Sequence, residues 1–225
     1  MASAAPNLFQ NQAVLRNLLH FLSQPLTTLH CALECSVVQS DAEGSEDVIL
    51  ALEQTDKVIE AVRLMREYLE AEEGCCSAAT ASVSSAIERV LHQLSVVAEA
   101  SSVRLFACGA SGAVIRMRDA WLQRALLYLV GTLVESEPAG GAIAIVLEDH
   151  ASQSILSGHS LSDKSSQDRA GGLFPASETL RHVKLAIAQR VFESSGATME
   201  LHLDGKPGFT IRIPRPGSTL SDVSA

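Results

Sequence analysis

The sequence predicts an α+β fold in which an N-terminal antiparallel helical hairpin, forming a dimeric four-helix bundle, is followed by an α/β sandwich. Three observations lead to this prediction. Residues 1–74 hold two long runs in which apolar side chains return every three or four positions, residues 75–85 are small and polar, and residues 86–215 alternate between helix-like and strand-like patterns. We therefore assign 1–74 to the hairpin, 75–85 to a linker, 86–215 to the sandwich and 216–225 to a loose tail.

The first helical run predicts a narrow bundle seam, because its apolar residues repeat with a period near 3.5. These residues are Leu15, Leu19, Leu22, Leu26, Leu29, Leu33 and Val37. A polar turn follows, in which Ser45 after Gly44 is a plausible helix N-cap. The second run ends at Gly74 and contains Ile49, Leu52, Ile59, Val62, Met65 and Leu69. One hairpin cannot cover such a seam alone but two can, so we expect a homodimer.

The remainder of the chain predicts helices packed on one face of a mixed sheet. Helical spacing covers 86–100, and "VRLFACG" and "AVIRMR" alternate like a pair of strands. The apolar helix "DAWLQRALLYLVGTLVESE" stops at Pro138, and the strand "AIAIVLED" is apolar enough to be buried on both faces. A weak strand at "QSILS", a helix ending at Gly196 and a final hairpin "TMELHLDGKPGFTIRIP" complete the predicted sandwich.

Composition excludes several classes of function. The 225 residues carry a net charge of −9 with no block of Lys and Arg, which argues against nucleic acid and anionic membrane surfaces as partners. We find neither a secretory signal nor an apolar stretch long enough to span a bilayer, and expect a cytoplasmic protein. The five cysteines show no metal-ligand spacing, so we expect reduced thiols and no bound metal.

Three segments, in the correct order, resemble the transmitter region of bacterial histidine kinases. "HFLSQPL", from His20 to Leu26, matches the family's phospho-acceptor motif at His, Leu, Pro and Leu. "DAWLQRALLYLVGTLVESEPAGGAI" is similar to the nucleotide-box helix and its following strand, and "HVKLAIAQRVFESSGATMEL" to the closing helix and strands. The resemblance covers roughly residues 10–215. It implies a dimerisation and histidine-phosphotransfer hairpin followed by a histidine-kinase-ATPase-like sandwich.

The chain departs from this family at the positions that hold the nucleotide. The resemblance places the family's Mg²⁺-holding Asn at Thr132 and a second frequent Asn at Tyr128. The Asp-x-Gly-x-Gly loop that reads the adenine is expected near "ILSGHSL", where no Asp is in place. The glycines that admit the phosphates map onto His182 and Lys184, whose side chains would block that approach. We therefore expect a degenerate ATPase-like domain without a nucleotide or other cofactor.

The histidine motif, in contrast, retains what phosphoryl transfer requires. A neutral imidazole is nucleophilic and titrates near neutral pH, and the spacing places His20 on the flank of the predicted seam. Phe21 replaces the acidic residue that assists the kinase reaction. Gln24, one turn after His20, is a candidate for positioning a water molecule, as polar residues there do in family members with phosphatase activity. The predicted docking face for a partner consists of Ser23, Gln24, Thr27 and Thr28.

The resemblance implies a phosphorelay histidine phosphotransfer protein in a two-component system, with His20 as the phospho-acceptor. Its partners would be response-regulator receiver domains, which supply Mg²⁺ and the aspartyl phosphate. Autokinase activity is not expected. Three alternatives stay open: a sensor histidine kinase with a divergent ATP site, a pseudokinase scaffold that binds a receiver or kinase without covalent chemistry, and His20 as an ordinary surface residue of a dimerisation helix.

Overall fold

A computed structural model describes residues 5–38, 44–75, 79–109, 112–162, 175–202 and 207–215. It divides the chain into two compact units. The hairpin unit comprises Met1–Leu69 with Phe174–Ala186, and the sheet unit comprises Glu70–Leu173 with Ile187–Ala225. The long helix α5 (Pro175–Ser194) is therefore shared between them, its first half grouping with the hairpin and its second half with the sheet.

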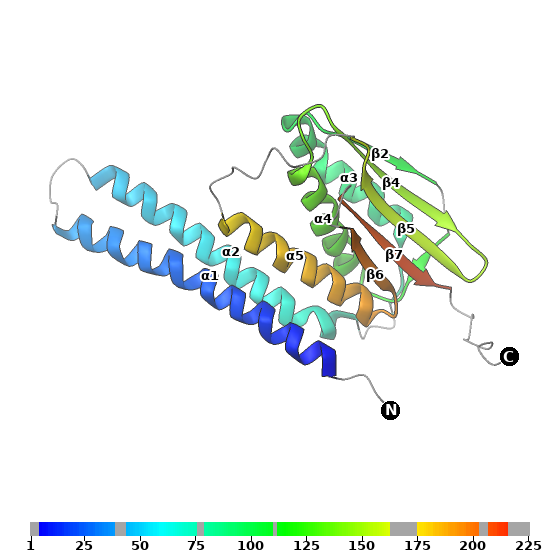
Figure 1. The fold of residues 1–225 in the computed structure, drawn as a ribbon, viewed down its shortest axis with the longest axis horizontal. Coiled ribbons are helices and arrows are strands. Elements are labelled where there is room, and N and C mark those ends of the chain that lie inside the picture. The colour runs from blue at the N-terminus through cyan, green and yellow to red at the C-terminus, as the bar shows by residue number, and fades with distance from the viewer. Residues whose placement is uncertain are drawn as a thin grey trace. The chain divides into compact units, whose positions relative to one another are not determined.

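The hairpin unit contains two long helices, α1 (Ala5–Val38) and α2 (Gly44–Cys75), which run side by side (Figure 1). The sequence predicts both. Helix α1 begins ten residues before Leu15, where the apolar repeat starts, and α2 ends one residue after Gly74. Pro25 lies inside α1 without ending it.

The large apolar residues that form the predicted seam are not the buried row of the hairpin. On α1 the buried positions among the described side chains are Leu18, Phe21, Pro25 and Ala32, whereas Leu19 is 59% exposed. Buried positions on α2 include the small residues Ala51 and Ala61. The large residues Leu64 and Tyr68 are buried on the same helix. Within a single hairpin, the predicted row therefore faces outward.

The sheet unit consists of helices and a mixed β-sheet, as expected for an α/β sandwich. Its five-stranded sheet has the order β2-β4-β5-β7-β6, and β1 and β3 form a separate antiparallel pair. Strand β2 runs parallel to β4, and the other neighbours in the large sheet are antiparallel. The elements are β1 (Ala81–Ser82), α3 (Val83–Ala100), β2 (Arg104–Cys108), β3 (Val114–Ile115), α4 (Asp119–Ser136), β4 (Ala142–Asp149), β5 (Gln153–Ser160), β6 (Thr198–His202) and β7 (Gly208–Pro214).

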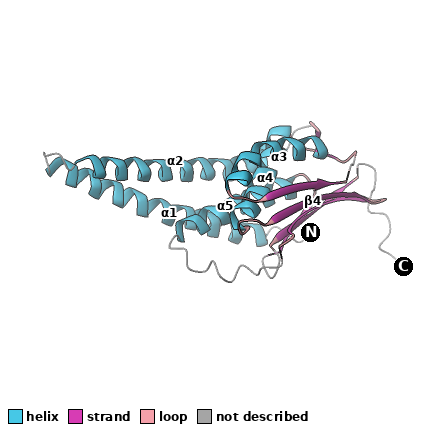
Figure 2. Ribbon diagram, turned by 90° about the horizontal axis from the view of Figure 1, so that it is seen from above, coloured by secondary structure: helices cyan, strands magenta, loops and turns pink. Residues whose placement is uncertain are grey.

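Helices α3 and α4 lie on one side of the sheet (Figure 2), and the core forms between them and the strand residues that face them. Burial alternates along β5 and β7, as expected for strands with one covered face. Strand β4 is buried on both faces over most of its length, as its continuous apolar run predicts. The largest fully buried side chains include Leu122, Leu129, Ile143, Leu156 and Phe209.

Three predictions about strands and connections differ from the structure. The predicted pair formed by "VRLFACG" and "AVIRMR" does not exist, because β2 pairs with β4 and β3 pairs with β1. The segment "QSILS", predicted as a weak strand, begins the full-length strand β5. This strand also includes most of "ILSGHSL", the segment where the Asp-x-Gly-x-Gly loop is expected. The predicted linker 75–85 includes β1 and the first turn of α3, where Ser82 caps the helix by accepting a hydrogen bond from the Ser85 N–H.

Candidate functional site

His20 is exposed on α1, whereas the nearby residues Leu18 and Phe21 are buried. Phe21, the next residue, is only 5% exposed and points away from solvent. Helical geometry places Gln24, Thr27 and Cys31 on the same side of α1 as His20, and all of them are exposed. The structure therefore brings the predicted acceptor and Gln24 onto one accessible polar surface.

The hydroxyl groups around His20 are held against the helix backbone. Ser23 Oγ donates to the Leu19 carbonyl at 2.9 Å, Thr27 Oγ1 to the Ser23 carbonyl at 2.8 Å, and Thr28 Oγ1 to the Gln24 carbonyl at 3.1 Å. Such bonds to the preceding turn slightly bend a helix, and here they accompany Pro25, which removes one backbone donor. The hydroxyl groups of Ser23, Thr27 and Thr28 therefore each donate a hydrogen bond within the helix.

A second surface of the hairpin is apolar and exposed. On α1 it consists of Leu19, Leu26 and Leu33, spaced by seven residues, each about half exposed. Helix α2 contributes a matching row of exposed residues, Ile49, Leu52, Ile59, Val62 and Leu69. Contiguous apolar surface of this kind on a helix marks an interaction site. His20 lies one position from Leu19 in the sequence and therefore about 100° around the helix from this row.

An ion-pair group on α2 was not anticipated from the sequence. Arg63 donates to both carboxylate oxygens of Glu60, at 2.8 and 2.7 Å, and lies 3.5 Å from Glu67. These hydrogen bonds hold the pKa of Glu60 below its ordinary value of 4.5, against the effect of burial, and the charges of Arg63 and Lys184 lower it further. The i, i+3 spacing of an acidic and a basic residue is the sequence signal that could have predicted the pair of Glu60 with Arg63.

The positions that correspond to the kinase nucleotide site divide between the two units. Tyr128 and Thr132 lie on α4 in the sheet unit, and both are buried. Thr132 is 4% exposed, and its hydroxyl oxygen has no hydrogen-bond partner. His182, exposed, and Lys184, half-buried, lie in the part of α5 that belongs to the hairpin unit. The residues that follow β5, from 163 to 174, lie outside the described part of the chain.

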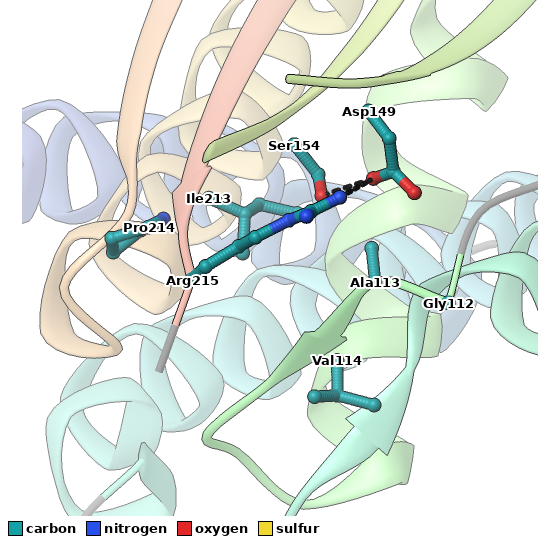
Figure 3. Close-up of a pocket in the computed structure, with 8 residues that line it drawn as sticks. All are labelled: Gly112, Ala113, Val114, Asp149, Ser154, Ile213, Pro214 and Arg215. Carbon is teal, nitrogen blue, oxygen red and sulfur yellow. Dashed lines mark hydrogen bonds and ion pairs between the residues drawn. The ribbon is translucent and has the colours of Figure 1, made fainter. Parts of the chain in front are cut away.

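A cavity of about 390 Å³ lies at one end of the sheet, between the 112–114 segment and the ends of β4 and β7 (Figure 3). Its polar wall is formed by Asp149, which accepts a hydrogen bond from Ser154 Oγ at 2.6 Å and pairs with Arg215 at 3.2 Å. Gly112, Ala113, Val114, Ile213 and Pro214 complete the lining. Because the charged groups engage each other, this cavity shows no excess charge for a ligand.

Two properties of the described residues bear on possible ligands and location. No group of three or more His, Cys, Asp or Glu side chains that could hold a metal ion occurs among them. None of the helices in these parts of the chain is both long and apolar enough to cross a membrane.

Comparison with known proteins identifies the fold. No protein-family model and no curated protein matches the sequence. A histidine kinase from Acinetobacter baumannii, AdeS, matches with a TM-score of 0.64 at 17% identity, over 87% of this chain and 97% of that one. This chain has a histidine-kinase-like fold. The full-length kinase ShkA, solved with AMPPNP, matches 90% of this chain and 45% of its own at a TM-score of 0.57 and 15% identity.

A histidine kinase from Burkholderia phymatum matches with a TM-score of 0.50 at 13% identity, over 88% of this chain and 97% of its own. The matches to AdeS and to this kinase extend over the hairpin as well as the sheet, because each covers more than four-fifths of the present chain. At these identities they establish the histidine-kinase-like arrangement of elements and leave the chemistry to be argued from the residues.

Proposed function

We propose that this protein is a phosphorelay histidine phosphotransfer protein, which passes phosphoryl groups between response-regulator receiver domains through His20 and does not bind ATP. The observation that carries the proposal is the exposed His20 in a "HFLSQPL" segment on the hairpin helix of a histidine-kinase-like fold. An exposed imidazole on a rigid helix can enter the active site of another protein. A ring packed between the helices could not.

The chemistry requires only one nucleophile from this chain. A neutral ring nitrogen of His20 attacks the phosphorus of an aspartyl phosphate on the partner receiver, a P–N bond forms, and the P–O bond to the aspartate breaks. The aspartate leaves as a carboxylate, and the reverse reaction returns the phosphoryl group to a second receiver. Mg²⁺ belongs to the receiver in this scheme, and Ser23, Gln24, Thr27 and Thr28 form the docking face around His20.

The residues at the nucleotide positions do not fit Mg-ATP. A threonine hydroxyl is shorter than the amide it replaces, and that of Thr132 is enclosed in the core. Tyr128, also buried, fills space on the same helix, and Phe21 offers no carboxylate to assist phosphorylation of its neighbour His20. These features support a role in which the sheet unit is retained for its structure, and phosphate reaches His20 from another protein.

A homodimer is part of the proposal. The exposed rows on α1 and α2 consist of large aliphatic side chains. A second hairpin that covered them would complete a four-helix bundle. His20 lies on a different side of α1 from Leu19, Leu26 and Leu33, so covering this row leaves the imidazole accessible.

The deciding experiment is phosphoryl transfer from receiver domains labelled on aspartate with ³²P. We expect acid-labile, base-stable label on this protein, as is typical of phosphohistidine, and no label on His20→Ala. The matched control is His30→Ala, which removes an exposed histidine from the same helix and should retain full labelling. If no receiver in a complete set from the source genome transfers label to the native chain, the proposal is wrong and the scaffold alternative is favoured.

Gln24 provides a second test of the same site. If its side chain positions water against phosphorylated His20 or the docked receiver, Gln24→Ala should slow loss of phosphate more than it slows transfer, in which Gln24 takes part only through the docking face. The sensor-kinase alternative predicts a heat of binding for Mg-ATP in calorimetry and labelling from [γ-³²P]ATP. Either result would replace the phosphotransfer reading by a kinase with a divergent nucleotide site.

A further inference from the structure

The free edge of β2 is a backbone surface that the proposed phosphotransfer function does not use. Strand β2 is the outermost strand of the sheet on its side and pairs only with β4 (Figure 1). The Arg104 N–H donates to the Gly141 carbonyl on the β4 side at 3.0 Å. Successive residues of a strand direct their backbone groups to opposite sides. Leu105 and Ala107 therefore direct both N–H and C=O groups toward the open edge.

These backbone groups have no hydrogen-bond partner in the described part of the chain. Exposed edges are normally blunted by charge, proline or a covering segment, because unpaired strand groups are a template for another strand. Here Ala107 is exposed and uncharged. The edge thus presents two N–H donors and two C=O acceptors, which are the groups that pair with an added strand.

An apolar groove accompanies this edge. A cavity of about 430 Å³ lies between the second half of α3 and the start of β2, lined by Leu91, Ser95, Ala98, Glu99, Val103 and Leu105 together with Ser102 and Arg104. On the same helix, Val96 is 72% exposed. An added strand would direct alternate side chains toward this groove, where an aliphatic side chain of moderate size matches the lining.

The other face of β2 would favour a different kind of side chain in an added strand. Phe106 alternates with Leu105 and therefore lies on the other face of the strand. Arg104 contributes to the lining of the groove, but its guanidinium lies over the Phe106 ring, 5.9 Å from the ring centroid. Both side chains are exposed. A partner residue beside them would gain from a negative charge opposite Arg104.

We propose that the β2 edge binds an extended segment of a partner protein as an additional strand, one in which aliphatic residues facing the groove alternate with acidic residues facing Arg104. The hydrogen-bonding pattern fixes an extended partner, and the groove and Arg104 fix its alternation. This surface lies in the sheet unit and is independent of His20. Loss of phosphotransfer in His20→Ala and loss of strand binding are therefore separable results.

The probe is a capped heptapeptide of alternating valine and glutamate, added to the full chain. The readout is hydrogen exchange of individual amides by NMR. We expect saturating peptide to slow exchange at Leu105 and Ala107 by about tenfold or more, since these amides gain a bond on binding. The Phe106 amide, already directed toward β4, should change little and is the internal reference. Peptides N-methylated at every second residue, in either register, are the control, and one of the two should lose binding.

Ala107→Pro removes an edge N–H without removing a bond to β4, and should weaken peptide binding by about tenfold. Ala107→Val keeps the donor and should bind within about twofold of the native chain. If the proline variant fails to fold, the N-methylated peptides still decide the question. Equal binding of both methylated peptides, or no added protection at Leu105 and Ala107, overturns the proposal. Protection that rises with protein concentration alone also overturns it, because a second copy would then occupy the edge.

Discussion

The buried hydroxyl of Thr132 gives a prediction with a magnitude that follows from the structure. Other helical threonines in this chain, including Thr27, Thr28 and Thr55, donate to the carbonyl one turn earlier. Thr132 does not, and its oxygen is enclosed without a partner. A buried polar group left unsatisfied costs about 1–3 kcal/mol, whereas a methyl group of similar size carries no such cost. Thr132→Val should therefore raise the free energy of unfolding by about 1 kcal/mol.

Urea unfolding followed by tryptophan fluorescence measures this effect directly, because Trp121 is the single tryptophan of the chain and lies buried on the same helix. In a thermal scan, a gain of about 1 kcal/mol corresponds to roughly 2–4 °C for a protein of this size. Thr132→Ser, which keeps the hydroxyl and loses a buried methyl group, should instead destabilise by about 1 kcal/mol.

A loss of stability in Thr132→Val would show that the hydroxyl has a partner, and would refute the reasoning from burial. The same measurement tests the nucleotide position. Added Mg-ATP should leave the unfolding midpoint unchanged in both proteins. A nucleotide-dependent increase in the native chain that disappears in Thr132→Val would mean that this hydroxyl holds the metal.

Three further predictions concern the hairpin and the sheet. Leu26→Glu should convert a dimer to a monomer in light scattering, because it places a charge in the exposed apolar row. The control Ser23→Glu, on the polar side of α1, should leave the mass unchanged. Equal masses for native protein and Leu26→Glu would remove the dimer from the proposal. Gly158→Ala should destabilise by about 1–3 kcal/mol in urea unfolding, because its Cβ would overlap the Phe209 ring and lie 2.6 Å from Cζ of that ring. The control Gly112→Ala meets nothing within 4 Å and should be nearly neutral. Lowering the pH through and below 4.5 should reduce the free energy of unfolding more in the native chain than in Glu60→Gln. A carboxylate whose pKa is lowered on folding stabilises the folded state above its unfolded pKa, and this stabilisation is lost as the group protonates. Identical acid profiles of the two proteins would contradict this.

The sequence predicted most elements because their signals are local. The two long helices follow from apolar spacing, β4 from its continuous apolar run, and the end of α5 from Gly196, which adopts a φ of +85° just after the helix. Strand partners could not be predicted in the same way. The pairing of β2 with β4 and of β3 with β1 joins segments separated by whole helices, and no short pattern encodes that choice.

The exposure of His20 on the flank of the apolar row was predictable from the sequence, whereas the role of the site stays a prediction. The "HFLSQPL" motif indicates which residues could carry chemistry, and the resemblance supplies their roles. Much of the predicted apolar row is exposed in a single hairpin, as expected for a seam that one hairpin cannot cover alone. The buried row of α2 was not named from the sequence, because it mixes small residues such as Ala51 and Ala61 with large ones such as Leu64 and Tyr68. The ion pairs of Arg63 with Glu60 and Glu67 also escaped prediction, since acid–base pairs on helices are usually solvated and unremarkable.

Helix α1 has three sides of different character. Phe21 and Pro25 occupy the inner side, Leu19, Leu26 and Leu33 an outer apolar side, and His20 with Gln24 a third side. An acidic residue at position 21 would have to be buried or move the helix, so the phenylalanine both fills the hairpin core and removes the carboxylate next to His20. A histidine that is accessible but without its kinase neighbour is suited to receive phosphate from outside, and Phe21→Glu should destabilise the hairpin without creating ATP-dependent labelling of His20.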